Sequence, residues 1–176
     1  MNDNSDILKQ KAIFRKMRFP EDRDILYAIH RAYDEEYGLS RSMEEYQKQM
    51  EFYSLHSTIY HPLVLMVGDQ PAGYIRAYDR ISMSSCDIVL MLDLVYVLPD
   101  FRKMGFGRIL MEQFMAFAQK IEAIRIDLLA DRDNEAAVEL YRSLGFKGRN
   151  RYQMIRFMQD NPELEEMFDR KKEISG

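Results

Sequence analysis

The feature that most constrains the fold is a single stretch, residues 88–110, with the sequence IVLMLDLVYVLPDFRKMGFGRIL. Residues 88–98 form an apolar run that only Asp93 interrupts. Two glycines, Gly105 and Gly107, then precede a segment whose apolar residues recur at helical spacing. Glycine lets a backbone approach an anion closely, and the first turn of a helix has unpaired N–H groups at the positive end of its dipole. The stretch therefore predicts a buried strand, a turn and a helix that together bind phosphate.

Residue spacing excludes two nucleotide-binding motifs that use a similar turn. A dinucleotide-binding fingerprint would require a third glycine at position 110, which Leu110 occupies. A P-loop would require lysine and then serine or threonine after its last glycine, whereas Gly107 is followed by Arg108. If the turn binds phosphate, it therefore does so as a site of another kind.

Two motifs in this half of the chain resemble those of one enzyme family. Arg-x-x-Gly-x-Gly at residues 102–107, after a Val-x-Val strand end at residues 95–97, resembles the acetyl-CoA-binding motif of the GCN5-related N-acetyltransferases, the GNAT family. The segment NEAAVELYRSLGF at residues 134–146 is similar to the Asn-x-x-Ala-x-x-Leu-Tyr-x-x-x-Gly-Phe signature of the same family. The resemblance covers about residues 88–158 and is weak before them.

The resemblance implies which groups hold acetyl-CoA. Backbone groups of the strand end would pair with the pantetheine arm as an added strand would, and amides of the turn would face the pyrophosphate. Asn134 would hydrogen-bond the cofactor, although asparagine is also an ordinary helix cap. The two glycines have a simpler alternative as well, a tight strand-to-helix turn without a ligand. The implied cofactor-binding set is Val95, Tyr96, Val97, Arg102, Lys103, Met104, Gly105, Phe106, Gly107, Arg108, Asn134 and Tyr141.

The resemblance also implies Tyr141 as the group that protonates the leaving thiolate of CoA. A phenol with an ordinary pKa of about 10 is protonated at neutral pH and can donate a proton to sulfur. The alternative is core packing, because Tyr141 follows Leu140 and lies about one helical turn before Leu144.

Asp93 is the second candidate catalytic residue, as the base that takes a proton from the amine. A carboxylate between Leu92 and Leu94 needs a partner, water or a function. Its position resembles that of a glutamate in polyamine acetyltransferases of the family, and the shorter aspartate leaves both direct proton abstraction and a water relay open. The alternative is an ion pair with a nearby arginine. Many members carry a further glutamate on the following strand, where this chain has Leu129, so that Asp127 is the other strand carboxylate.

Composition is that of a globular protein and predicts no nucleic-acid or membrane partner. The 176 residues suit one N-acetyltransferase domain over 1–176, with a frayed N-terminus at 1–11 and a charged C-terminal extension at 159–176. The net charge is −4, and no apolar run reaches the ~18 residues that a membrane span needs. A single cysteine, Cys86, and a polar N-terminus predict a cytoplasmic protein. Homodimers are frequent in the family, so a homodimer is a further expectation.

No metal is expected in this protein. His30, His56 and His61 show no metal-ligand spacing with Cys86 or with one another. All three are predicted to lie at the surface or in loops, where His56 or His61 could line an acceptor site.

Periodicity and turn residues predict the element order β-α-α-β-β-β-α-β-α-β-β. That order is typical of the GNAT fold, a mixed α/β (α+β) architecture. Its central sheet is mixed but mostly antiparallel, with about six to seven strands and helices on both faces. The predicted strands are residues 12–18, 63–67, 72–78, 88–98 and 123–130, with two closing strands at Phe146 and 152–158. The predicted helices begin near Pro20, at a Ser42-x-x-Glu45 capping box, after Gly107 and at Asp133.

These observations predict an N-acetyltransferase that moves the acetyl group of acetyl-CoA to a primary amine by direct attack in a ternary complex. Residues 21–51 carry nine carboxylates against four basic side chains. This excess favours a small cationic amine as the acceptor, unless the charges only solvate the outer helix faces. Two alternatives stay open: a protein N-terminal or lysine acetyltransferase, and a non-catalytic module that binds acyl-CoA.

Overall fold

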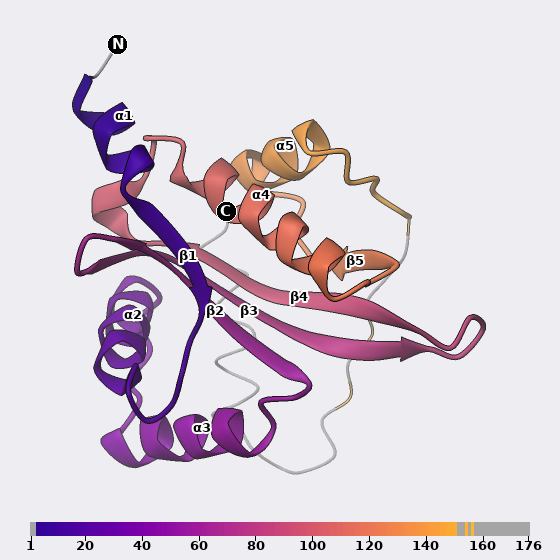
Figure 1. Cartoon of the computed structure of the whole chain (residues 1–176), viewed down its shortest axis with the longest axis horizontal. Helices are drawn as coiled ribbons and strands as arrows, with labels where there is room; N and C mark the ends of the chain where they lie inside the picture. The colour runs from indigo at the N-terminus through magenta and orange to yellow at the C-terminus, as the bar shows by residue number, and fades with distance from the viewer. Residues whose placement is uncertain (1–2, 151–153, 155, 157–176) are drawn as a thin grey trace.

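A five-stranded sheet forms the middle layer of the computed structural model, which describes residues 3–150, 154 and 156 (Figure 1). The strands lie in the order β1-β2-β3-β4-β5; the first three neighbouring pairs are antiparallel, and β5 runs parallel to β4. The mixed sheet with helices on both faces confirms the predicted fold class. In chain order the elements are α1 (Asp3–Gln10), β1 (Ala12–Lys16), α2 (Arg23–Glu36), α3 (Met43–Leu55), β2 (Tyr60–Val67), β3 (Gln70–Ser82), β4 (Asp87–Val97), the 3-10 helix η1 (Pro99–Phe101), α4 (Phe106–Lys120), β5 (Arg125–Leu128) and α5 (Glu135–Ser143).

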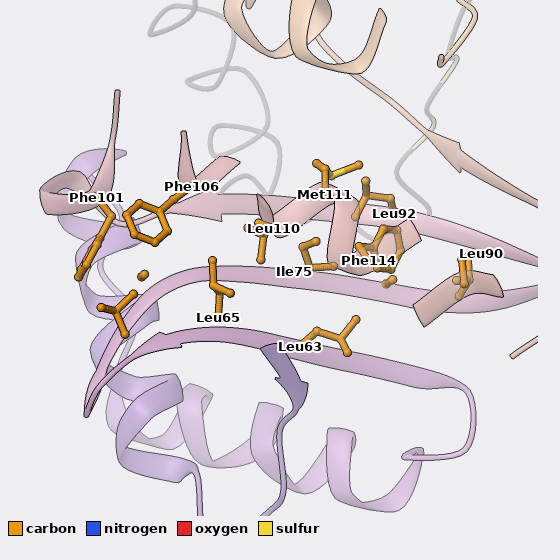
Figure 2. Packing of buried hydrophobic residues seen from close by; sticks show 14 residues of the cluster. Leu63, Leu65, Ile75, Leu90, Leu92, Phe101, Phe106, Leu110, Met111 and Phe114 are labelled. Atoms are coloured by element: carbon orange, nitrogen blue, oxygen red, sulfur yellow. The ribbon is translucent and has the colours of Figure 1, made fainter. Parts of the chain in front are cut away.

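Helices α2 and α3 cover one face of this sheet, and α4 and α5 cover the other (Figure 1). On the α4 side, Leu110 and Phe114 are fully buried and belong to the same core as Leu65 and Ile75 of the sheet (Figure 2). The predicted apolar face of the long helix is thereby confirmed. We call this layer the α4-side core.

Strand β2 is buried on both faces, which explains the uninterrupted apolar sequence of its residues 63–67. Leu63 and Leu65 belong to the α4-side core, whereas Val64 and Met66 belong to a second cluster that includes Leu26 of α2. A strand covered by helices on both sides has no solvent face, so polar residues do not alternate along it.

A β-bulge in β4 sets Asp93 apart from its neighbours. Arg76 of β3 lies opposite Leu94, while the next residue, Ala77, lies opposite Leu92. Two residues of β3 thus span three of β4, and Asp93 is the extra one. Bulges re-aim side chains and occur often beside active sites.

The bulge also changes which residues of β4 face each layer. Leu90 and Leu92 lie in the α4-side core before the bulge, and Val95 and Val97 pack against that core after it. Because side chains alternate along a strand, one extra residue exchanges the two faces. A single apolar face therefore continues along β4 although its spacing changes at Asp93.

Strands β4 and β5 separate at the same point. Their pairing begins with Val89 opposite Arg125 and ends with Leu92 opposite Leu128. Residues 93–97 continue beside β3. Among the described residues, no strand pairs with the other edge of this segment, where the family resemblance implies that pantetheine adds as a strand.

Residues 3–10, expected to be frayed, instead form α1. Leu8 packs against the α4-side core, and burying this side chain favours an ordered helix over a loose tail.

The described sheet has five strands rather than six to seven because the predicted closing strands are not part of it. Residues 146–150 form no strand. The Phe146 N–H instead donates to the Tyr141 carbonyl at 3.0 Å and so closes the end of α5. Most of the second predicted strand, and all of residues 159–176, lie outside the described residues.

Helix caps agree with the sequence at α3 and differ at α5. The Glu45 N–H donates to Ser42 Oγ at 3.3 Å, and the Ser42 N–H donates to Glu45 Oε2 at 2.6 Å, which confirms the capping box. Helix α5 begins one residue later than predicted, because Asn134 rather than Asp133 is its cap. The Asn134 Oδ1 accepts from the Ala137 N–H at 3.1 Å.

Candidate active site

The turn between β4 and α4 has the backbone geometry of an anion site. Gly105 is the N-cap of α4 and has a φ of 87°, in the left-handed region that favours glycine. The N–H groups of the first turn after it point along the helix axis, away from their own helix. A Cβ at Gly107 would lie 3.5 Å from Leu140 and 3.7 Å from Val97, which is ordinary contact. Gly105 is thus the position that requires glycine, while alanine would fit at Gly107.

Helix α1 brings a cation to this turn. A Cβ at Gly105 would lie 3.6 Å from Cε and 3.7 Å from Nζ of Lys9. No sequence signal predicts this proximity, because the two residues are far apart in the chain and the contact depends on α1 being ordered.

The Arg102 side chain is held by protein groups. Its guanidinium donates from Nη1 to Glu36 Oε1 at 2.8 Å and from Nη2 to Oε2 at 2.5 Å. It also lies 5.4 Å from the Tyr96 ring centroid. The hydrogen bond from Arg102 is the main cause that lowers the pKa of the Glu36 carboxyl. This cluster fixes the motif turn to the end of α2.

Two of the predicted cofactor-binding residues at the strand end are also engaged by this cluster. The Tyr96 hydroxyl donates to Glu36 at 2.8 Å, and the Val97 carbonyl accepts from Arg102 Nε at 2.9 Å. A pantetheine contact at Val97 would therefore use its N–H or displace Arg102.

Tyr141 lies on α5, half-buried against the α4-side core. Its ring centroid is 5.8 Å from that of Phe146. Burial raises the pKa of its hydroxyl, so the phenol is protonated at neutral pH. The packing alternative is confirmed, and it is compatible with proton donation because only the ring is needed for packing.

Asp93 is paired with Arg76, whose Nε donates to Oδ2 at 2.5 Å. The ion pair considered as an alternative is thus present. The Asp93 side chain nevertheless stays 43% exposed, because it opens onto a cavity of about 350 Å³ between α3 and the sheet. The cavity is lined by Gln49, Phe52, Tyr53, Tyr60, Arg76, Tyr78 and Asp93.

Several carboxylates of the acidic segment are engaged in local pairs. Asp34 is buried, pairs with Arg41 and accepts from the Tyr46 hydroxyl at 2.5 Å. Glu44 pairs with Lys48 at 2.9 Å. These contacts support the reading of the charges as local structure, and they weaken the argument that the segment attracts a cation through its net charge.

Asp127, the other strand carboxylate named in the sequence analysis, is also held in ion pairs. Asp127 pairs with Arg80 and with Arg125, and the hydrogen bond from Arg125 is the main cause that lowers its pKa. Leu129 follows β5 and is 67% exposed. Asp93 is thus the strand carboxylate that lines the cavity.

The sequence matches the model of the acetyltransferase (GNAT) family over residues 26–146, which is more than half of the chain. The chain is a GNAT-family acetyltransferase. A comparison with curated proteins gives no match to this acetyltransferase.

Solved structures share the fold of this acetyltransferase at low sequence identity. An aminoglycoside acetyltransferase from an uncultured soil metagenomic sample, in complex with sisomicin, gives a TM-score of 0.75 at 12% identity, covering 87% of this chain and 99% of that chain. A possible acetyltransferase from Clostridium difficile 630 gives 0.71 at 20% identity, covering 85% and 99%. AAC(6')-Iy in complex with the bisubstrate analogue CoA-S-monomethyl-acetylneamine gives a TM-score of 0.69 at 16% identity, covering 84% of this chain and 99% of that chain.

Two of the three histidines of the acetyltransferase are buried, contrary to the prediction. His30 is 2% exposed, and burial lowers its pKa to about 3. It lies four residues after Leu26 and three before Tyr33, a helical spacing that predicts a buried position. His61 is buried within β2, and His56 is exposed at the end of α3. Neither His56 nor His61 lines the cavity beside Asp93.

The described part of the acetyltransferase contains neither a cluster of metal ligands nor a membrane-spanning helix. Over those residues, no three or more His, Cys, Asp or Glu side chains are grouped so as to hold a metal ion. Within the same residues, no helix has the length and apolar character needed to cross a membrane.

Proposed function

We propose that this acetyltransferase transfers the acetyl group of acetyl-CoA to the primary amine of a small cationic molecule by direct attack in a ternary complex. The position of Asp93 carries the proposal. It is the bulged residue at which β4 leaves β5, and it also lines the cavity beside α3. A thioester held along the open edge of β4 and an amine held in the cavity would meet at this residue.

The donor side is built from β4, the turn and α5. Backbone groups of residues 95–97 offer pairing partners to the amides of pantetheine, and the amides of residues 103–107 face the pyrophosphate, since the Arg108 N–H already donates to the Gly105 carbonyl at 3.2 Å. Arg102 holds the turn in place through Glu36. Because the Asn134 oxygen already caps α5, its contact with the cofactor would use the side-chain NH₂ group.

The reaction takes two protons from the nitrogen of the ammonium group and gives one proton to the sulfur of CoA. Acetyl-CoA supplies the acetyl thioester; the C–N bond forms as the C–S bond breaks. The ammonium group first loses a proton to the Asp93 carboxylate, directly or through water, because its exposed side admits solvent. The second proton leaves the nitrogen after the C–N bond has formed and passes to solvent water, to which Asp93 also releases its proton. The departing thiolate takes the Tyr141 hydroxyl proton, and Tyr141 regains a proton from solvent.

A thiol-release assay with acetyl-CoA over a panel of amines, polyamines, aminoglycosides and peptides tests this function. We expect turnover with a small amine, and a loss of at least about 100-fold in kcat for Asp93→Asn. Turnover confined to peptides would favour the protein acetyltransferase. No turnover, with CoA still raising the thermal midpoint, would leave only the acyl-CoA-binding module.

A further inference from the structure

Four aromatic rings stand together in the cavity that Asp93 lines. The Tyr60 ring centroid lies 4.9 Å from that of Phe52, 5.7 Å from that of Tyr78 and 6.4 Å from that of Tyr53. All four residues line the cavity, and Phe52 remains 42% exposed. We call these four residues the ring cluster. Such a cluster offers a surface on which a flat apolar group can stack.

Regular structure, rather than a loop, fixes the ring cluster. Phe52 and Tyr53 are neighbours in the last turns of α3, and Tyr60 of β2 lies directly opposite Tyr78 of β3. Arg76 lies two residues before Tyr78 and therefore on the same face of β3. The rings and the charged pair are thus held side by side by the helix and the sheet.

Hydrogen bonds order the polar edge of the cavity. Arg76 holds Asp93 at 2.5 Å through Nε, and its Nη1 donates to the Tyr53 hydroxyl at 3.5 Å. Gln49 Nε2 donates to the same hydroxyl at 3.0 Å. The carboxylate is thereby fixed next to the rings, with its exposed side open to a ligand.

The charge of the lining limits which amines fit. The lining contains one carboxylate, Asp93, and one guanidinium, Arg76, so its formal charge is zero. One ammonium group can pair with the exposed side of the Asp93 carboxylate, which leaves the ring cluster to hold the rest of the molecule. Further ammonium groups on the same molecule would lie near Arg76 without counter-ions, which opposes binding.

We infer that the acceptor is a monoamine whose primary amine is joined by a short chain to an aromatic ring, and that polyamines and aminoglycosides are poor substrates. The inference rests on the proposed function: Asp93 receives the ammonium group, and the ring cluster holds the aromatic body. The volume of about 350 Å³ lies near the lower end of small-molecule sites and suits a ligand of one or two rings.

Comparison of four amines with the wild-type enzyme tests this inference. We expect kcat/KM for 2-phenylethylamine to exceed that for n-butylamine, spermidine and sisomicin by about 10-fold, as roughly 1.4 kcal/mol of ring contact predicts. A higher value for any of the other three would overturn the inference while the proposed function stands. If none of the broader amine and peptide panel reacts although CoA still stabilises the fold, the proposed function fails as well.

Variants of the ring cluster test the same inference by a second route. Tyr78→Leu and Phe52→Leu should each lower the ratio of kcat/KM for 2-phenylethylamine to kcat/KM for n-butylamine about 10-fold, because only the first amine carries a ring that can stack on the ring cluster. The matched control is Tyr27→Leu, whose ring packs on Tyr46 at 5.2 Å outside the cavity. Equal losses for both amines, or no loss, would contradict the inference. Because Phe52 is 42% exposed, we expect Phe52→Leu to fold normally and to test the inference even if Tyr78→Leu disturbs the sheet.

Discussion

At the scale of single residues, Tyr141 packs through its ring and is proposed to donate a proton through its hydroxyl, so removal of one oxygen atom tests the second role alone. Its ring packs against Phe146 with centroids 5.8 Å apart, and its hydroxyl is the proposed proton donor. Tyr141→Phe keeps the ring, so we expect CoA affinity and stability to be retained while kcat falls about 10²- to 10⁴-fold. Thiol release and CoA titration measure the two quantities, with Tyr27→Phe as the control. An unchanged kcat under rate-limiting chemistry would leave Tyr141 with packing alone.

His30 predicts how stability depends on pH. Burial lowers its pKa from 6.5 to about 3 in the folded state, so between those values the unfolded chain binds a proton that the folded chain does not. Stability should therefore fall as the pH is lowered through this window. We expect about 2 kcal/mol of the loss in unfolding free energy between pH 7 and pH 5 to come from this group.

Urea unfolding at the two pH values tests this expectation. His30→Phe should flatten the pH dependence, whereas His56→Gln, at an exposed histidine, should leave it unchanged. The same slope in His30→Phe as in the wild type would show that other groups cause the pH dependence.

At the scale of elements, α1 adds a cation to the turn between β4 and α4. With Lys9 Nζ 3.7 Å from the Cβ position of Gly105, we expect Lys9→Gln to weaken CoA binding. The effect should be about 5-fold in Kd, or roughly 1 kcal/mol for a solvent-accessible charge contact. Calorimetric titration measures it, with Lys11→Gln as the control. Equal weakening for pantetheine, which lacks the phosphates, would show that Lys9 acts on something other than the phosphates.

The elements that local sequence determines could be predicted. Ser42 and Glu45 cap α3 as expected, and the glycine turn leads from β4 into α4. The bulge could not be predicted, because a single aspartate in an apolar run also suits an ion pair in a regular strand. Nor could the contact between Glu36 and Arg102, which joins residues 66 positions apart.

The same division applies to the candidate site. Its proposed donor side was inferred from two sequence motifs, whereas its proposed acceptor side depends on tertiary structure. Phe52, Tyr60 and Tyr78 come from three elements, and each ring alone is ordinary apolar packing material. The expectation that the acidic segment attracts a cation was weakened for the same physical reason. Whether Asp34 or Glu44 can attract a ligand depends on their ion-pair partners, Arg41 and Lys48.

At the scale of the whole molecule, the two halves of the proposed site come from opposite layers. The donor half uses β4, α4 and α5, the acceptor half uses α3, β2 and β3, and Asp93 lies where they join. Direct transfer needs no covalent acyl-enzyme. Cys86, the single cysteine, precedes β4 by one residue and lies seven residues before Asp93. That separation corresponds to about 23 Å of extended chain, which places Cys86 away from the acceptor cavity.

The most direct test is an initial-rate matrix in which acetyl-CoA and the best amine are both varied. Direct attack in a ternary complex predicts double-reciprocal lines that intersect, and Cys86→Ser should leave both the pattern and kcat unchanged. Parallel lines, together with an acetylated enzyme formed from acetyl-CoA alone, would contradict the proposal that donor and acceptor meet at Asp93.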